Sequence, residues 1–444
     1  MKKHFSDRNP SSLEEIMARY ALQPNTARKR VLMISESNSI DFLEQKFRNH
    51  ERYEVINEAI ENIIAVGVKK YIQAVAQAIK QDTAFFDGIT GFFDTPNAVA
   101  VSISHLTGKK SPSLESIVRC QNKLLCRSLQ KESVPENTPA FVSARDFLAL
   151  HPFSPAFIKP LRAAGSFGCG IIHNANELPK KIEADKPMLH QFNQPYIEAI
   201  AAASNDGVIL QAIQNCNDYL CEEVITGQQF AVNGYIVNDN ISLHGIVAEI
   251  LLPNSKSFER HEHPTQLSDK WLRRIDVMVE RFISYTGLDN TEFDIEFFID
   301  FEKDKLTIIE INPRAVAQYE NLYAMASGDD MLTTICALAC GDAPPPRQIP
   351  KYKFCYSWEL RTFEDLHILE IPDAANLSDI YASYPDVKVV NRIPPGIKKL
   401  SESKRSIDTY RYCMVSIPGN SRTEIMEIVS DIKQRLNYRF APVN

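Results

Sequence analysis

Two glutamates, Glu296 and Glu310, interrupt apolar runs in the segment FDIEFFIDFEKDKLTIIEINPR, residues 293–314. The first run alternates apolar and polar residues with a period of two, which predicts a strand. The second run, residues 306–312, is rich in β-branched residues and also predicts a strand. A hairpin centred on Lys303 would place Glu296 opposite Glu310, with their Cβ atoms roughly 5 Å apart.

Two like charges that face each other on a sheet are destabilising. The pair is tolerated if one carboxylate is protonated, if both lie in open water, or if a cation lies between them. Hard oxygen ligands suit Mg²⁺, which takes one or two carboxylates and completes its coordination with water and phosphate. This segment alone leaves open the alternative of a solvated hairpin with its charges on the outer face.

Three further features precede the hairpin in the chain. Lys123 lies in the segment CQNKLLCRSL, and Lys159 in FIKP is followed by a glycine-rich loop with Gly165, Ser166, Phe167, Gly168 and Gly170. The third feature is CEEVITGQQFAV, residues 221–232. Each alone has an ordinary explanation as a solvated lysine, a tight turn or a strand edge.

Together these features predict a nucleotide site. Backbone N–H groups of a glycine loop surround phosphates, and lysines supply compact positive charge to them. A strand such as residues 222–225 offers backbone groups to an adenine edge in an apolar slot. The loop is neither a Walker A sequence, because no Gly-Lys-Ser/Thr follows it, nor a dinucleotide fingerprint.

The order of these motifs resembles that of the ATP-grasp superfamily, over residues 29–341. The resemblance implies that Lys123 and Lys159 bind the α- and β-phosphates of ATP, while the loop closes over the β- and γ-phosphates. It also assigns the adenine to the hinge, the ribose hydroxyls to Gln229, and magnesium ions to the hairpin. The hinge residues are Glu222, Glu223, Val224 and Ile225, and the magnesium ligands are Glu296, Glu310 and Asn312.

The resemblance further implies a reaction. ATP-grasp enzymes transfer the γ-phosphoryl group to a carboxylate, and an amine then attacks the acyl phosphate. Arg314, with Lys159, would stabilise the developing charge. Length, the EINPR motif and the C-terminal segment are similar to those of L-amino-acid ligases. These enzymes join small-molecule carboxylate and amine substrates, which are free amino acids, into dipeptides and release ADP and phosphate. The expected cofactors are ATP and Mg²⁺, for which Mn²⁺ substitutes. The stretch from Ala315, AVAQYENLY, departs from the glycine-containing loop of many such ligases.

Two other functions are weighed against this one. A biotin-dependent carboxylase is disfavoured, because the stretch after the hinge lacks the His-Gln-Lys run that is typical of biotin carboxylases. A non-catalytic ATP-binding scaffold is disfavoured, because a pure binder has little need of Arg314.

Several other reactive side chains receive structural interpretations. Cys169 in the glycine loop invites a thioester mechanism, but the expected chemistry needs no covalent protein nucleophile. Cys336 and Cys340 on a predicted helix are interpreted as small buried hydrophobes rather than as a metal or redox pair. His261 and His263 are placed in a loop before Pro264, in a solvated or substrate-side role rather than as zinc ligands.

The elements that must position these residues follow an α/β order. The buried-strand segment KRVLMIS is followed by alternating helices and strands, which predicts a parallel sheet. The expected fold is ATP-grasp, with a Rossmann-like N-terminal α/β domain, a two-subdomain ATP clamp and a C-terminal α/β lobe. The expected boundaries are a leader (1–28), the N-terminal domain (29–118), the ATP-grasp domain (119–341, divided into 119–215 and 216–341), a Pro-rich linker (342–350) and the C-terminal lobe (351–444).

The amino-acid composition limits the kinds of partner that the protein is expected to bind. The chain has 444 residues, 44% of them hydrophobic, and a net charge of −7. This balance gives no electrostatic footprint for nucleic acid. No apolar run approaches the roughly 20 residues that span a bilayer. Nine scattered cysteines do not indicate a disulfide framework, so a reduced, cytoplasmic protein is expected. A homodimer is neither supported nor excluded.

Overall fold

The computed structural model describes residues 12–21, 27–403 and 408–443. Most of the predicted leader lies outside these residues, apart from α1 (Leu13–Ala21). Ser12 and Glu15 form a capping box at the start of α1, because each side chain accepts the other's backbone N–H, at 3.2 and 3.0 Å. Within the described residues, none of the helices combines the length and the apolar character that crossing a bilayer requires.

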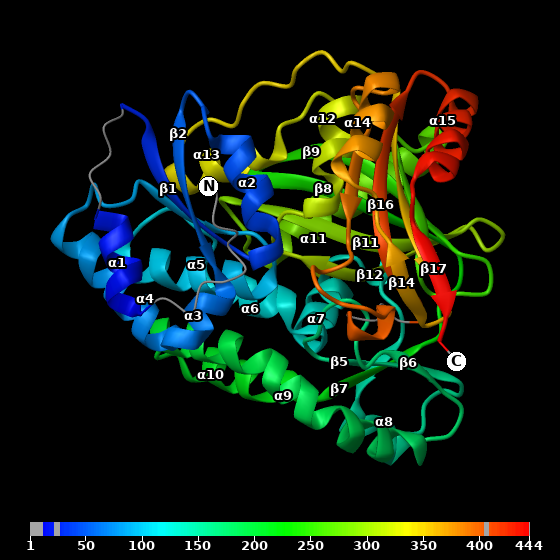
Figure 1. Cartoon of the computed structure of the whole chain (residues 1–444). Coiled ribbons are helices and arrows are strands. Elements are labelled where there is room, and N and C mark those ends of the chain that lie inside the picture. Colours follow the sequence, from blue (N-terminus) through cyan, green and yellow to red (C-terminus); the bar gives the residue numbers. More distant parts are fainter. Residues whose placement is uncertain (1–11, 22–26, 404–407, 444) are drawn as a thin grey trace.

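The N-terminal layer is a small parallel sheet with helices around it (Figure 1). The sheet has the order β2-β1-β3, and both strand pairs are parallel, which confirms the predicted α/β arrangement. The strands are β1 (Lys29–Ser35), β2 (Tyr53–Ala59) and β3 (Gly88–Gly91), and the helices are α2 (Ile40–Phe47), α3 (Ile60–Val66), α4 (Val68–Gln81) and α5 (Asp94–Thr107).

The segment from Ser111 to Lys131 has a continuous helical pattern in the sequence, but the structure divides it into two helices, α6 (Leu114–Gln121) and α7 (Lys123–Ser133). Asn122 breaks the helix, and its side chain accepts hydrogen bonds from the backbone N–H groups of Leu124 and Leu125. The break makes Lys123 the first residue of a helix. Its backbone N–H donates to the carbonyl of Leu161, just before the glycine loop.

A second sheet, with the order β4-β7-β5-β6, carries the glycine loop between two of its strands. The strands of this sheet are β4 (Phe141–Ser143), β5 (Ala156–Pro160), β6 (Gly170–Ile172) and β7 (Tyr219–Glu223), and the helices beside it are α8 (Ala144–Leu150), α9 (Glu177–Ala203) and α10 (Gly207–Gln214).

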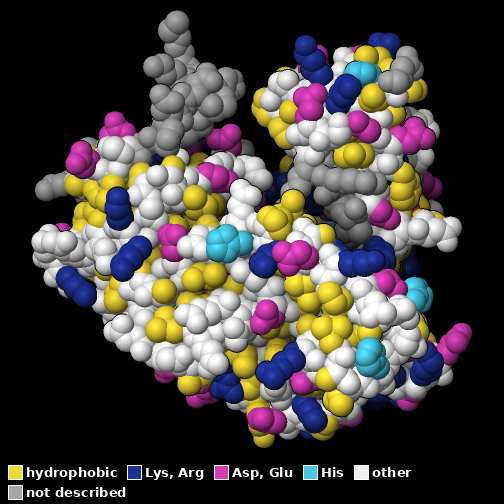
Figure 2. All heavy atoms as spheres, turned by 90° about the horizontal axis from the view of Figure 1, so that it is seen from below, with side chains coloured by type: hydrophobic (Ala, Val, Ile, Leu, Met, Phe, Trp, Pro, Cys, Tyr) yellow, Lys and Arg dark blue, Asp and Glu magenta, His cyan; other side chains and the backbone are white. Residues whose placement is uncertain are grey.

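On the face of the molecule seen from below, basic and acidic side chains are mixed and do not form separate patches of one sign (Figure 2).

The largest sheet is antiparallel and has the order β12-β11-β8-β9-β10-β13-β16-β15. It crosses the predicted linker, because β13 from the C-terminal lobe pairs with β10. The domain boundaries therefore stay predictions. Its strands are β8 (Gln228–Val237), β9 (Asn240–Leu251), β10 (Phe258–His263), β11 (Thr291–Asp300), β12 (Lys305–Asn312), β13 (Phe354–Thr362), β15 (Lys388–Asn391) and β16 (Tyr410–Gly419).

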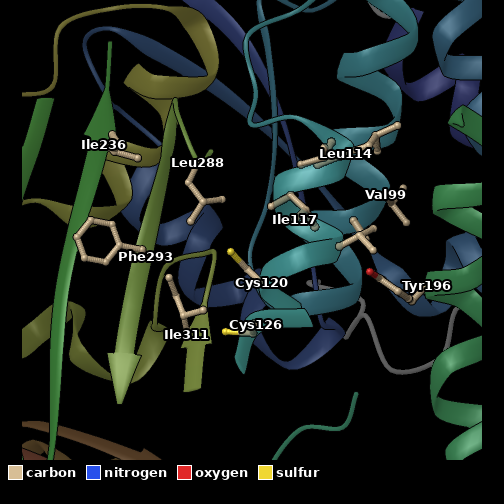
Figure 3. Close-up of a cluster of buried hydrophobic side chains, with 14 of the residues drawn as sticks. Val99, Leu114, Ile117, Cys120, Cys126, Tyr196, Ile236, Leu288, Phe293 and Ile311 are labelled. Carbon is tan, nitrogen blue, oxygen red and sulfur yellow. The ribbon is translucent and has the colours of Figure 1, made fainter. Parts of the chain in front are cut away.

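The apolar face of the carboxylate hairpin packs on α6 and α7. Phe293 and Ile311 belong to the same buried cluster as Cys120 and Cys126 (Figure 3). The alternate residues of both strands therefore face the opposite side. The remaining elements are α11 (Asp269–Thr286), α12 (Glu320–Ala326), α13 (Met331–Cys340), β14 (Leu366–Glu370), α14 (Ala374–Ser383), α15 (Arg422–Arg435) and β17 (Arg439–Pro442).

The structure tests two of the interpretations given above for cysteine and histidine side chains. Cys336 is buried and unbridged, as predicted, whereas Cys340 is only partly buried, so the prediction that it is buried is wrong. The loop placement of His261 and His263 is wrong, because both lie in strand β10 and are 1% and 2% exposed. The pattern FERHEH has too few apolar residues to signal a buried strand, and pairing with β9 and β13 overrides that local signal.

A buried charge cluster lies on β9 and β11. His244 Nε2 is 3.5 Å from Glu292 Oε1, and its Nδ1 is 3.6 Å from Asp329 Oδ2. Arg347 from the Pro-rich linker pairs with the same Asp329, at 2.8 Å. Burial alone would lower the pKa of His244, but Asp329 and Glu292 outweigh burial and raise the pKa to about 9. This histidine is therefore charged at neutral pH.

We expect the free energy of unfolding to fall as pH rises through this titration. A raised histidine pKa stabilises the fold fully below the unfolded pKa of 6.5, and this stabilisation is lost as pH rises through about 9. The loss amounts to about 3 kcal/mol at most. Urea unfolding at pH 6 and pH 9 measures it, and His244→Gln should flatten the dependence. The control is His190→Gln, which changes an exposed histidine. If the unfolding free energy of His244→Gln depends on pH as strongly as that of the control and of the native protein, His244 is not the group that titrates.

Candidate active site

The predicted pairing of the two glutamates is confirmed, because Glu296 faces Glu310 across β11 and β12. Asp304 adopts a left-handed φ of 52° at the turn, where no glycine is present. The register shifts just beyond Glu296, so that Ile309 has no partner in the ladder. Such a bulge re-aims neighbouring groups. The Ile309 carbonyl accepts hydrogen bonds from Lys159 Nζ at 3.1 Å and from the Arg127 guanidinium at 2.7 Å.

Both predicted phosphate-binding lysines lie beside this hairpin. Lys123 Nζ is 3.1 Å from Glu310 Oε2, and Lys159 Nζ is 2.8 Å from Glu222 Oε2. Burial would raise the pKa of Glu310, but Lys123 and Lys159 outweigh burial and lower it. Burial and the nearby Arg127 lower the pKa of Lys159. The lysines therefore form a buried positive pair whose carboxylate partners come from different strands.

Glu222 has a structural role that the hinge motif did not reveal. Its side chain is 3% exposed and contacts both Lys159 and Arg127. Arg127 and Lys159 overcome burial and lower the pKa of Glu222, which is therefore ionised. The β7 ladder runs through Glu223, so Val224 and Ile225 lie beyond it. The expected backbone contacts to adenine therefore centre on those two residues.

Glu222→Gln should destabilise the protein by about 3–5 kcal/mol, because it leaves two buried cations without their carboxylate. The neighbouring Glu223→Gln is the matched control. Its side chain is 38% exposed and pairs with Lys305 at 3.4 Å, so it should cost no more than about 1 kcal/mol. Urea unfolding compares the two, and equal losses would refute the role of Glu222.

Acidic side chains from three strands gather beside Glu296. The Asn312 amide donates to Asp294 at 2.8 Å and to Glu296 at 3.3 Å, and the Gln229 amide donates to Glu296 at 3.1 Å. Burial, with Glu249 and Glu310 nearby, raises the pKa of Glu296 well above its ordinary value. Burial also raises the pKa values of Asp294 and Glu249. This part of the site carries more carboxylates than nearby cations neutralise.

Arg314 joins the hairpin to the N-terminal layer. Its Nε is 2.8 Å from Oδ1 of Asp94, the first residue of α5. Burial would lower the pKa of Arg314, but Asp94 and Asp294 outweigh burial and raise it. A small cleft lies beside Asp94, and its lining includes Lys123, Arg162, Glu310 and Asn312.

The glycine loop has the conformation that its composition predicts. Gly165, Ser166 and Gly168 have φ angles of 60°, 57° and 73°. A Cβ atom on Gly168 would lie 2.7 Å from Pro160 Cγ, so glycine is required there. Phe167 packs against the core of this subdomain. Burial raises the pKa of Cys169 to about 11, which keeps its thiol protonated and agrees with the absence of a thioester role.

Comparison with known protein families identifies one domain of the chain. A sequence model of the ATP-grasp domain matches residues 153–321. These residues are therefore an ATP-grasp domain. No curated protein sequence matches the chain significantly.

Solved structures share the ATP-grasp fold over nearly the whole chain. L-amino acid ligase from Bacillus licheniformis has a TM-score of 0.70 at 15% identity, over 94% of this chain and 100% of that chain. Biotin carboxylase from Campylobacter jejuni has a TM-score of 0.63 at 14% identity, over 93% and 92% of the two chains. N5-carboxyaminoimidazole synthetase from Staphylococcus aureus has a TM-score of 0.60 at 13% identity, over 92% and 97%. The predicted fold is confirmed.

The ATP-grasp site fits a divalent cation by its donor chemistry. Within the described part of the chain, no group of three or more His, Cys, Asp and Glu side chains is arranged to hold a metal. The candidate ligands are instead two carboxylates and one amide, Glu296, Glu310 and Asn312. Mg²⁺ is usually bound by one or two carboxylates together with phosphate and water. Glu249 Oε2 is also buried without a hydrogen-bond partner among the described residues.

Sequence reasoning missed several charged groups of this ATP-grasp site. Asp294 was visible in the alternating hairpin pattern but carried no motif. Arg127, Arg162, Asp94 and Glu249 lie far from the hairpin in the sequence and are brought to it only by packing. Arg162, for example, donates to Thr95 at the start of α5, at 3.2 Å.

Proposed function

We propose that this protein is an ATP-dependent carboxylate–amine ligase that forms an amide bond between two small molecules, which we expect to be amino acids. The observation that carries the proposal is the convergence of three buried cations, Lys123, Lys159 and Arg314, on one carboxylate hairpin. Compact positive charge at a sheltered cleft suits phosphoryl transfer, in which positioning and charge stabilisation supply most of the catalysis.

The nucleotide is assigned to the cleft side of the hairpin. Lys123 and Lys159 bind its phosphates, and backbone N–H groups of the glycine loop close over them. Val224 and Ile225 contact the adenine, and Gln229 lies within reach of the ribose. Glu296, Glu310 and Asn312 would hold Mg²⁺, which would neutralise charge on the transferred phosphoryl group.

The reaction then has two steps. A substrate carboxylate attacks the γ-phosphorus, and the bond from that phosphorus to the bridging oxygen of ADP breaks. The amine next attacks the acyl carbon of the acyl phosphate, and phosphate leaves as the amine loses a proton. Arg314 provides a charged, planar fork for the oxygen on which negative charge develops. The closed glycine loop keeps water from the acyl phosphate.

Phosphate release by the purified protein tests the proposal. Mg-ATP is supplied with all amino acids, singly and in pairs, and the products are weighed by mass spectrometry. Phosphate release that depends on a particular pair, with the mass of the matching dipeptide, would establish the ligase and name its substrates.

Other outcomes separate the alternatives. A requirement for bicarbonate would favour a carboxylase. ATP binding without phosphate release across the panel would contradict amino-acid ligation and favour a scaffold or a different substrate pair. The variant Arg314→Ala is measured beside the native protein. Phosphate release that this variant loses comes from the proposed site.

A further inference from the structure

A row of polar side chains crosses the large sheet away from the hairpin. Gln229, Glu249, His261, Ser357 and Ser416 are direct cross-strand partners on β8, β9, β10, β13 and β16 in turn. Direct partners in antiparallel strands point to the same face. The last four are each at most 3% exposed. The row therefore runs, buried, from the ATP-grasp domain into the C-terminal lobe.

Most of this row lacks hydrogen-bond partners. Within the described part of the chain, the unpartnered buried atoms include Glu249 Oε2, both ring nitrogens of His261, and the hydroxyls of Ser357 and Ser416. His261 Nε2 lies 3.9 Å from Glu249 Oε1, which is too long for a hydrogen bond. Buried polar groups are nearly always hydrogen-bonded in folded proteins. Consecutive unpartnered groups on four strands indicate that polar atoms from outside the chain complete the row.

An arginine cluster lies beside the far end of the row. Arg361, Arg392 and Arg411 surround Glu359, two residues along β13 from Ser357. Arg411 is 3.1 Å from Glu359, and Arg361 is 3.9 Å from it. The Nε atoms of Arg361 and Arg392 are buried without partners. Glu359 pairs with Arg361 and Arg411, while Asp408 and Glu36 are close enough to act on Arg361 and Arg392.

The electrostatics of the cluster agree with this geometry. Burial lowers the pKa of Arg361 despite Glu359, and burial with the nearby Arg411 lowers the pKa of Arg392. Glu36, which follows β1 in the N-terminal layer, is close enough to Arg392 to oppose that effect. Two guanidinium groups of the cluster therefore carry a charge that burial disfavours, and Arg392 lies near Glu36 of the N-terminal layer.

The row connects the cluster with the proposed site of chemistry. Gln229 donates to Glu296 at 3.1 Å, and Tyr319 contacts both Glu249 and His261. Adjacent strands are about 4.8 Å apart, so β13 lies about 10 Å from Glu249 on β9 and about 19 Å from Glu296 on β11. A small molecule that lies along the row covers the shorter of these distances.

We propose that this row and the three arginines form a subsite that binds the anionic end, a carboxylate or a phosphate, of one of the two substrates. The assignment to a substrate rests on the proposed ligase function. The row orients the molecule, because its carboxylate, imidazole and hydroxyl groups accept and donate hydrogen bonds along the length of the ligand. Arginine pairs of this kind bind carboxylates and phosphates with two parallel hydrogen bonds.

Calorimetric titration of the full chain tests the subsite directly. The probes are L-glutamate with its neutral counterpart L-glutamine, and O-phospho-L-serine with L-serine. At least one acid should bind more tightly than its neutral counterpart, and the pair that shows this identifies a carboxylate or a phosphate as the ligand. Arg361→Gln and Arg411→Gln should each weaken that binding by about tenfold or more. The matched control is Arg435→Gln, whose guanidinium pairs with Asp379 and Asp431 on the far side of the lobe.

The outcomes distinguish this proposal from the ligase function. Equal binding of acids and neutral counterparts, no binding by any probe, or an equal loss in Arg435→Gln would overturn the subsite. Phosphate release in the amino-acid panel that Arg361→Gln and Arg411→Gln leave unchanged would also overturn it, while the ligase function would stand. Acid-selective binding that both variants lose, without any phosphate release, would support the subsite and count against the ligase.

Discussion

Glu310→Ala should abolish turnover, with a loss of about a thousandfold or more. Glu310 faces Glu296 across the hairpin and pairs with Lys123 at 3.1 Å. Removal of its carboxylate takes away a proposed metal ligand and the partner of Lys123, which is proposed to bind phosphate. The remaining charges would then hold neither Mg²⁺ nor the nucleotide phosphates in register.

The measurement is phosphate release as a function of Mg²⁺ concentration, with nucleotide binding followed separately. The variant should need far more Mg²⁺ for any residual activity. Glu302→Ala, in the exposed turn of the same hairpin, is the control. Full activity of Glu310→Ala at ordinary Mg²⁺ would refute the metal assignment, and a large loss in Glu302→Ala would show that the hairpin itself is fragile.

The hairpin shows why part of this site was predictable from sequence. Alternation of apolar and polar residues reports which side chains share a face, and a polar turn sets the register, so Glu296 opposite Glu310 followed from local pattern. The bulge at Ile309 did not follow, because no glycine or other local signal marks it. Its carbonyl nevertheless binds both Lys159 and Arg127.

Long-range contacts set the limit of sequence reasoning elsewhere. Asn122 stops one helix and caps the next through its own side chain, which the continuous helical pattern concealed. Arg127 and Asp94 meet the site only after packing, so spacing carries no signal for them. The buried polar row was hidden for the same reason, because its members come from five strands that are adjacent only in the sheet.

The fold was more predictable than the site because it depends on many residues at once. The order of strand and helix signals, with the ATP-grasp motifs along it, indicated the architecture that comparison confirms. The continuation of the sheet into the C-terminal lobe was not indicated, because the pairing of β10 with β13 joins strands of ordinary composition across a Pro-rich segment.

Arg314→Ala should retain ATP binding and lose product formation, by about a thousandfold or more in kcat. Arg314 is held by Asp94 at 2.8 Å, whereas the proposed phosphate-binding lysines pair with Glu310 and Glu222. Its proposed contribution arises only as charge develops on the reacting oxygen, so the ground-state complex with ATP loses little without it.

The test is whether Arg314→Ala lowers kcat, the affinity for ATP, or both. Product formation is measured by mass spectrometry, and ATP affinity by equilibrium binding, for Arg314→Ala, Arg314→Lys and an exposed control, Arg281→Ala, whose guanidinium pairs with Glu136 on the surface. Arg314→Lys keeps the charge but not the planar fork, and should fall between the native protein and Arg314→Ala. An equal loss of ATP affinity and of kcat in Arg314→Ala would mean that Arg314 binds the nucleotide. An unchanged kcat would remove it from the reaction, because a group that stabilises the transition state acts on the rate.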